Sequence, residues 1–255
     1  MKKLFLAWQD PNKRDWLPVG RLTYEKNVYC FVYTKGAKNS ENFIPFSGMQ
    51  KLDSVYESSE PFPILSNRLL SSSRSDYSDF ISWLNIEDGK ENTLQILSLT
   101  GGIRKTDNIE IFPCPEPNIE GGYEVQFFCR GLSHLTKETW KNVDSLKIGD
   151  RLYLLKDLQN PFEENALALR TDDPATIVGY CPRYFNKDFN LMLDKCGVNS
   201  VHVVVERLNL NAPLQLRLLC KLQSPWPKNF NPCSDELYEP MPASAKNAES
   251  ECLFT

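Results

Sequence analysis

The chain has 255 residues, of which 41% are hydrophobic and 24% charged, with a formal net charge of −4 and a pI near 5.4. This acidic balance argues against broad, sequence-independent binding to duplex DNA, which depends on counterion release by a basic surface. The mean hydropathy is −0.41 and the sequence lacks a run of about 18 apolar residues, so it predicts no membrane span.

Residues 1–112 are expected to form a β-rich region with a few helices. The apolar run that starts at Leu4 is too short for a signal peptide and therefore predicts a first strand. The predicted strands are residues 1–10, 17–22 and 29–33, and the predicted helices are residues 77–84 and 92–99. Gly101 and Gly102 are a good signal for the end of the second helix.

A segment rich in proline and glycine, residues 113–122, predicts a linker to a second region at residues 123–210. The elements expected there are strands over residues 124–130, 152–155, 166–169, 177–180 and 199–208, and a helix over residues 186–193. Residues 211–240 are expected to be a packed extension that contains a short helix or strand. Residues 241–255 have too little apolar content to fold and are expected to be disordered.

The segment from Ile148 to Tyr184 carries the strongest pattern in the chain: strand, turn, strand, turn, strand. Its turn is Asn160-Pro161-Phe162-Glu163-Glu164-Asn165-Ala166, and its last strand ends in Val178-Gly179-Tyr180-Cys181-Pro182-Arg183. This pattern resembles the HIRAN domain, which has an Asn-Pro-aromatic-acidic turn and a Val-Gly-Tyr-x-Pro-Arg strand end. The resemblance implies a small OB-like β-barrel over residues 123–210, in a mainly β (α+β) chain.

The same resemblance implies that the barrel holds the free 3′ end of single-stranded DNA. The positions carried over are Arg130, Asn160, Phe162, Glu163, Tyr180 and Arg183, with Tyr184 and Lys187 adjacent to them. Phe162 and Tyr180 would stack on bases, because every base has a π face. Arg130 and Arg183 would contact phosphate, and Glu163 would contact the terminal hydroxyl. This sequence departs from the family after Arg130, where Gly131 and Leu132 replace expected aromatic residues.

The residues themselves leave plainer alternatives open. Asn160-Pro161 is a turn initiator in any β-protein, where the Asn side chain bonds the local backbone. Phe162 suits burial as well as stacking, because phenylalanine is commonly buried. An aromatic with a polar tip beside an arginine, as with Tyr180 and Arg183, is typical of a nucleic-acid surface.

The sequence gives no sign of catalysis. His134 and His202 have no recognisable nucleophile near them in sequence, and a P-loop pattern is missing. None of the eight cysteines belongs to a C-x-x-C pair, so neither a zinc site nor a disulfide framework is expected. We therefore expect a protein without cofactor or metal that is not an enzyme, with free thiols, in a reducing cytoplasm.

Residues 1–112 also resemble the N-terminal domain of HipA-type toxin kinases. The residues that carry this resemblance are Val19-Gly20-Arg21-Leu22 and Asn67-Arg68-Leu69-Leu70. Two hypotheses follow. The chain is either a single-stranded DNA-binding protein of repair, replication forks or defence, or a regulatory module of a HipA-type system without DNA binding. A helicase, nuclease or HipA-type kinase would then act in trans.

Overall fold

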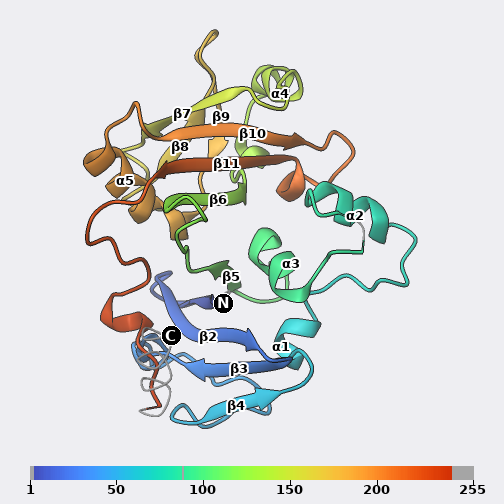
Figure 1. The fold of residues 1–255 in the computed structure, drawn as a ribbon, viewed down its shortest axis with the longest axis vertical. Coiled ribbons are helices and arrows are strands. Elements are labelled where there is room, and N and C mark those ends of the chain that lie inside the picture. Colours follow the sequence, from blue (N-terminus) through green and yellow to red (C-terminus); the bar gives the residue numbers. More distant parts are fainter. Residues whose placement is uncertain (1–2, 88, 243–255) are drawn as a thin grey trace. The chain divides into compact units, whose positions relative to one another are not determined.

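The computed structural model describes residues 3–87 and 89–242 (Figure 1). The chain divides into two compact units. Unit 1 comprises Met1–Ser72, Glu91–Cys114 and Asn231–Thr255, and unit 2 comprises Ser73–Lys90 and Pro115–Phe230. Each unit has its own antiparallel sheet and its own hydrophobic core, which confirms a mainly β chain with a few helices.

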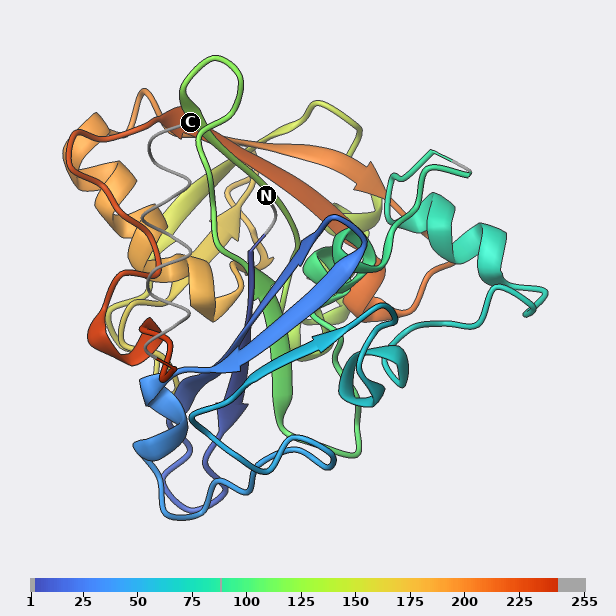
Figure 2. The same ribbon diagram turned by 60° about the horizontal axis from the view of Figure 1, so that its bottom comes forward.

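Unit 1 contains a five-stranded sheet in the order β4-β3-β2-β1-β5, and β1 to β4 run side by side in Figure 2. The strands are β1 (Leu4–Gln9), β2 (Trp16–Glu25), β3 (Val28–Tyr33), β4 (Val55–Ser58) and β5 (Ile109–Pro113). The β2–β3 hairpin turns at Lys26 and Asn27, whose φ angles of 48° and 64° are the left-handed pair of a type I′ turn. The predicted first strand and hairpin are therefore confirmed.

The helices of unit 1 follow local capping signals. They are α1 (Pro63–Ser66), α3 (Thr93–Thr100) and the short 3-10 helices η1 (Lys35–Lys38) and η4 (Glu236–Tyr238). The Asn92 side chain caps α3 by accepting a hydrogen bond from the Gln95 amide at 2.8 Å. The helix ends at Gly101, which has a left-handed φ of 70°, as the sequence predicts.

Unit 2 contains a six-stranded antiparallel sheet in the order β6-β11-β10-β7-β8-β9. The strands are β6 (Gly122–Phe128), β7 (Arg151–Lys156), β8 (Leu167–Arg170), β9 (Ile177–Tyr180), β10 (His202–Leu208) and β11 (Leu218–Pro225). An isolated antiparallel bridge joins Arg130, just beyond edge strand β6, to Tyr180 at the end of edge strand β9. The sheet therefore curls until its two edges meet at one point, as a small barrel requires.

Unit 2 also contains helices, most of which contact its sheet. They are α2 (Tyr77–Trp83), α4 (Lys137–Asp144), α5 (Arg183–Cys196), η2 (Leu132–His134) and η3 (Leu214–Leu216). Among them, α4, α5, η2 and η3 contact the sheet. Phe185, Phe189 and Met192 of α5 are buried against Phe127 of β6 in the core. The predicted helix over residues 186–193 is confirmed, but it begins earlier, at Arg183.

The structure differs from the expected regions in three places. β11 pairs with both β6 and β10, so the sheet continues beyond the expected end at residue 210. Residues 73–90 belong to unit 2, where the Asn209 side chain donates to the Trp83 carbonyl at 2.9 Å. The extension expected at residues 211–240 is divided between the units, because Tyr238 packs edge-on against Phe5 of unit 1 at 4.9 Å. Of the expected disordered tail, residues 243–255 lie outside the described residues.

Candidate nucleic-acid interface

The closure between β6 and β9 positions two of the expected site residues. The Arg130 amide donates to the Tyr180 carbonyl at 2.8 Å, and the Tyr180 amide donates to the Arg130 carbonyl at 2.9 Å. Gly179 makes this close approach feasible, because a Cβ there would lie 2.2 Å from Cys129 Sγ and 2.7 Å from the Arg130 oxygen. The glycine of the Val-Gly-Tyr motif is thus explained by barrel closure.

Strand register places Tyr180 on the outer face of the barrel. Tyr180 pairs with Ala168, and Ala168 pairs with Leu155, so these three residues form one row on the same face of β9, β8 and β7. Leu167 and Leu169, the direct neighbours of Ala168 on β8, point into the core. Side chains alternate along a strand, so the row of Tyr180 faces outward.

The loop between β7 and β8, residues 157–166, is organised by Asn160. Its Oδ1 accepts hydrogen bonds from the amides of Phe162 and Glu163, both at 3.1 Å. Its Nδ2 donates to Oδ2 of Asp157 at 3.0 Å. The turn role that the sequence left open for Asn160 is therefore the one that the structure shows.

Asp157 connects this loop to the barrel, a role that was not predicted from the sequence. The same Oδ2 also accepts a hydrogen bond from the Tyr180 hydroxyl at 3.0 Å. The donors Asn160 and Tyr180 hold the pKa of Asp157 below its usual range. Burial raises the pKa of Tyr180, and the bond to Asp157 raises it further. In the sequence, Asp157 stands out only as an acidic residue three positions before Asn160, and this spacing is common in turns without a functional role.

Phe162 lies at the tip of the loop with 78% of its surface exposed. The alternative of burial is therefore wrong, since the neighbouring turn directs the ring into solvent. Leu158 in the same loop is 85% exposed. Glu163 accepts a hydrogen bond from the Asn165 amide through Oε1 at 3.2 Å, which fixes the carboxylate beside the aromatic tip.

Helix α5 carries the remaining expected residues. Arg183 is its first residue, and Lys187 follows four residues later, so both lie on one side of the helix. Tyr184 packs edge-on against Phe185 with ring centroids 4.8 Å apart, and it is partly buried in the core. The Asn190 side chain donates to the Asn165 carbonyl at 3.0 Å, which fastens the loop to this helix.

The structure thus brings Asn160 and Tyr180 together around Asp157, with Phe162 and Glu163 on the turn that Asn160 holds and with Arg130 joined to Tyr180 through the backbone. Among residues 3–87 and 89–242, no group of three or more His, Cys, Asp or Glu side chains could hold a metal ion. Within those same ranges, every helix is too short or too polar to cross a bilayer.

Comparison with known proteins assigns the barrel to a family. The family model of the HIRAN domain matches residues 123–226, so the prediction of a HIRAN domain is confirmed and its extent reaches through β11. This match begins at residue 123 and gives no support to the HipA resemblance of residues 1–112, nor to the regulatory alternative. No curated protein matches the chain.

Two solved structures are similar to part of the chain. The crystal structure of the HIRAN domain of human HLTF is 16% identical, with a TM-score of 0.31, over 42% of this chain and 77% of that one. A protein from Lactobacillus plantarum is 18% identical, with a TM-score of 0.32, over 41% of this chain and 97% of that one. At such low scores these likenesses add no argument to the family match.

Proposed function

We propose that the HIRAN domain of this protein binds single-stranded DNA at a free 3′ end. The observation that carries the proposal is the exposure of Phe162 at the tip of a loop whose conformation is held by Asn160. An exposed phenylalanine loses hydrophobic stabilisation unless something covers it. A nucleobase is a suitable cover, because base–aromatic stacking contributes about 1–3 kcal/mol per base.

Each nearby group then has a distinct role. Phe162 and Tyr180 stack on the terminal bases. Arg130 and Arg183 contact phosphate, since a guanidinium can donate two parallel hydrogen bonds to it. Glu163 accepts a hydrogen bond from the terminal 3′ hydroxyl through the oxygen that does not bind the Asn165 amide.

The acidic net charge of −4 agrees with a small local site. For single strands, each phosphate contact contributes a slope of about −0.7 to the logarithmic salt dependence of binding. Two arginine contacts therefore predict a slope of roughly −1.4, much shallower than that of a protein with a long basic groove. We infer that the domain recognises the 3′ end of a strand and makes few contacts with the backbone along the rest of it.

We further propose that the protein acts by binding alone, in repair, replication-fork or defence processes. Chemistry on the DNA would come from a helicase or nuclease that acts in trans. What supports this proposal is the kind of side chain at the interface. Its aromatic and charged groups suit stacking and ion pairing, and no nucleophile contacts a base among the described side chains.

Fluorescence anisotropy with a short labelled strand tests the proposal. The strand carries either a free 3′ hydroxyl or a blocked 3′ end, at an ionic strength of about 0.15 M. We expect tight binding that the block abolishes, and a loss of about tenfold or more in affinity for Phe162→Ala. Ile44→Ala, which removes an exposed apolar side chain in unit 1, is the matched control and should bind normally.

Arg183→Ala tests the phosphate contact in the same assay, with the exposed Arg104 of unit 1 as the control position for loss of one charge. Equal binding of free and blocked strands would remove the end-capture mechanism. Absence of binding to both strands would remove the DNA-binding function.

A further inference from the structure

A second cationic and aromatic surface lies on the outer face of the same barrel, centred on Tyr153 of β7. The guanidinium carbon of Arg151 lies 5.0 Å from the centroid of the Tyr153 ring, and that of Arg170 lies 4.8 Å from it. The Arg170 side chain is held by a hydrogen bond from Nη1 to the Thr171 carbonyl at 2.8 Å. These contacts hold the Tyr153 ring on the outer face of the sheet, away from the hydrophobic core.

Strand register connects this surface to the candidate DNA site. Tyr153 pairs with Arg170, and Arg170 pairs with Ile177, so these residues form the row next to that of Tyr180. Neighbouring rows on one face of a sheet are separated by two residues, or about 7 Å. Tyr153 on β7 is also two strands from Tyr180 on β9, or about 10 Å across the sheet, so the two residues lie roughly 12 Å apart. A single-stranded segment of more than one nucleotide is therefore needed to span the distance from Tyr180 to Tyr153.

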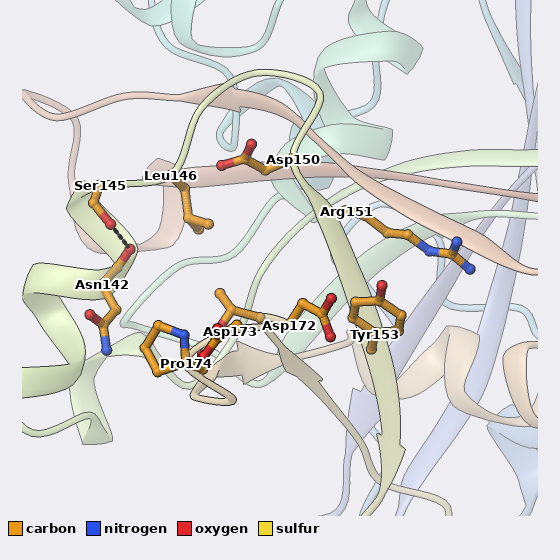
Figure 3. Close-up of a pocket in the computed structure, with 10 residues that line it drawn as sticks. Asn142, Ser145, Leu146, Asp150, Arg151, Tyr153, Asp172, Asp173 and Pro174 are labelled. Atoms are coloured by element: carbon orange, nitrogen blue, oxygen red, sulfur yellow. Dashed lines mark hydrogen bonds between the residues drawn. The ribbon is translucent and has the colours of Figure 1, made fainter.

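A cleft of about 360 Å³ opens beside Tyr153 (Figure 3). Its walls come from α4, the turn after it, β7 and the loop between β8 and β9. The β8–β9 loop is internally fixed, because the Thr176 amide donates to Thr171 Oγ1 at 3.1 Å and the Asn142 side chain donates to Thr176 Oγ1 at 3.2 Å. The cleft is thus bordered by segments of defined conformation.

The charges around the cleft decide what it can hold. Asp150, Asp172 and Asp173 line it together with Arg151, and Figure 3 shows Asp172 next to Tyr153. Three carboxylates repel a phosphate, so the backbone is not a suitable occupant. Carboxylates do accept hydrogen bonds from the exocyclic amino groups of bases. The cleft therefore suits the edge of a base whose phosphate stays near the arginines.

We propose that Tyr153 and this cleft form a nucleobase subsite for a nucleotide on the 5′ side of the captured 3′ end. The inference rests on the proposed function, because a strand whose 3′ end is held by the Phe162 loop can only continue in the 5′ direction. The subsite takes a base that carries an amino group, such as cytosine or adenine, in preference to thymine. Asp172 and Asp173 accept the hydrogen bonds, and the Tyr153 ring together with the Arg151 and Arg170 guanidinium groups over it supplies the stacking surface.

The test measures the affinity of the full chain for strands with a free 3′ hydroxyl, from a dinucleotide upward. For the unchanged protein we expect a step of about tenfold in affinity as the strand becomes long enough to reach Tyr153. Tyr153→Ala should remove this step and leave the dinucleotide affinity unchanged, which also shows that the variant is folded. Tyr153→Phe, which retains a stacking ring, should keep the step.

Base preference is read from strands that differ only in cytosine or thymine at the upstream positions. We expect a preference for cytosine that the double substitution Asp172→Ala with Asp173→Ala removes. A dinucleotide that binds by its 3′ end, without a step at greater length, would refute the subsite and leave the proposed function intact. So would a step that Tyr153→Ala does not change. Absence of binding at every length would refute both.

Discussion

Replacement of Gly179 by alanine tests whether barrel closure positions the DNA-binding residues. Gly179 has a φ of 142°, which L-residues rarely adopt, and a Cβ there would lie 2.2 Å from Cys129 Sγ and 2.7 Å from the Arg130 oxygen. The strained backbone would cost about 1–3 kcal/mol. The overpacking would cost about 1–3 kcal/mol more. We therefore expect Gly179→Ala to lower the free energy of unfolding of unit 2 by roughly 2–6 kcal/mol.

Gly149→Ala is the matched control for this experiment. Gly149 also has a positive φ, of 89°, but a Cβ there would have no neighbour within 4 Å. It should therefore show only the conformational part of the cost, about 1–2 kcal/mol. Urea denaturation compares the two variants, and hydrogen exchange at the Arg130 and Tyr180 amides reports the closure directly.

Amide hydrogen exchange and DNA-end binding test the closure and its role in recognition separately. Gly179→Ala should accelerate exchange at both amides and weaken DNA-end binding, whereas Gly149→Ala should leave both properties unchanged. If the two variants are equally stable and exchange equally slowly, the contact at Gly179 does not define the closure. If Gly179→Ala opens the closure but binds DNA normally, the geometry of Arg130 and Tyr180 is not needed for recognition.

Three further substitutions probe individual interactions. Hydrogen bonds from Ser40 and from the Lys13 and Asn12 amides hold the pKa of Asp10 well below its usual range. The stabilisation that ionised Asp10 gives the fold is therefore complete at neutral pH and is lost as pH falls below 3.8. The difference in urea midpoint between Asp10→Asn and the unchanged protein should shrink in that range. Tyr180→Phe should keep most of the DNA affinity in anisotropy titrations, whereas Tyr180→Leu should lose roughly tenfold, because the ring and not the hydroxyl stacks on the base. Arg68→Met should cost about 3 kcal/mol in urea denaturation, since it leaves Asp107 and the Gly102 and Ile64 carbonyls without this buried donor.

The strands and the binding loop could be predicted because their signals are local. The turn at residues 160–166 depends on one Asn side chain that bonds the next amides, and such a turn forms wherever that short sequence occurs. The α3 boundaries likewise follow from Asn92 at one end and Gly101 at the other. In each case the determining contacts lie within about four residues of one another, which is the range that a sequence pattern describes.

The remaining features depend on contacts between distant residues. The strand β11 closes the sheet between β6 and β10, and no local pattern in residues 218–225 shows which strands would flank it. Helix α4 has only Trp140 and Val143 facing the core, so its apolar stripe was too narrow to recognise. Asp157 became important only because β9 brings the Tyr180 hydroxyl to it from 23 residues away.

The departure from the family after Arg130 has a structural consequence that bears on function. Gly131 has a φ of 75°, and a Cβ there would lie 3.2 Å from Cδ2 of the Tyr180 ring. The Tyr180 ring therefore lies over Gly131, in space that the side chain of a larger residue would occupy. We infer that one aromatic, Tyr180, carries the stacking on this side of the site, where two were expected. Gly131→Phe should then displace Tyr180 and weaken DNA-end binding; stronger binding by this variant would instead show that the glycine is a lost stacking surface.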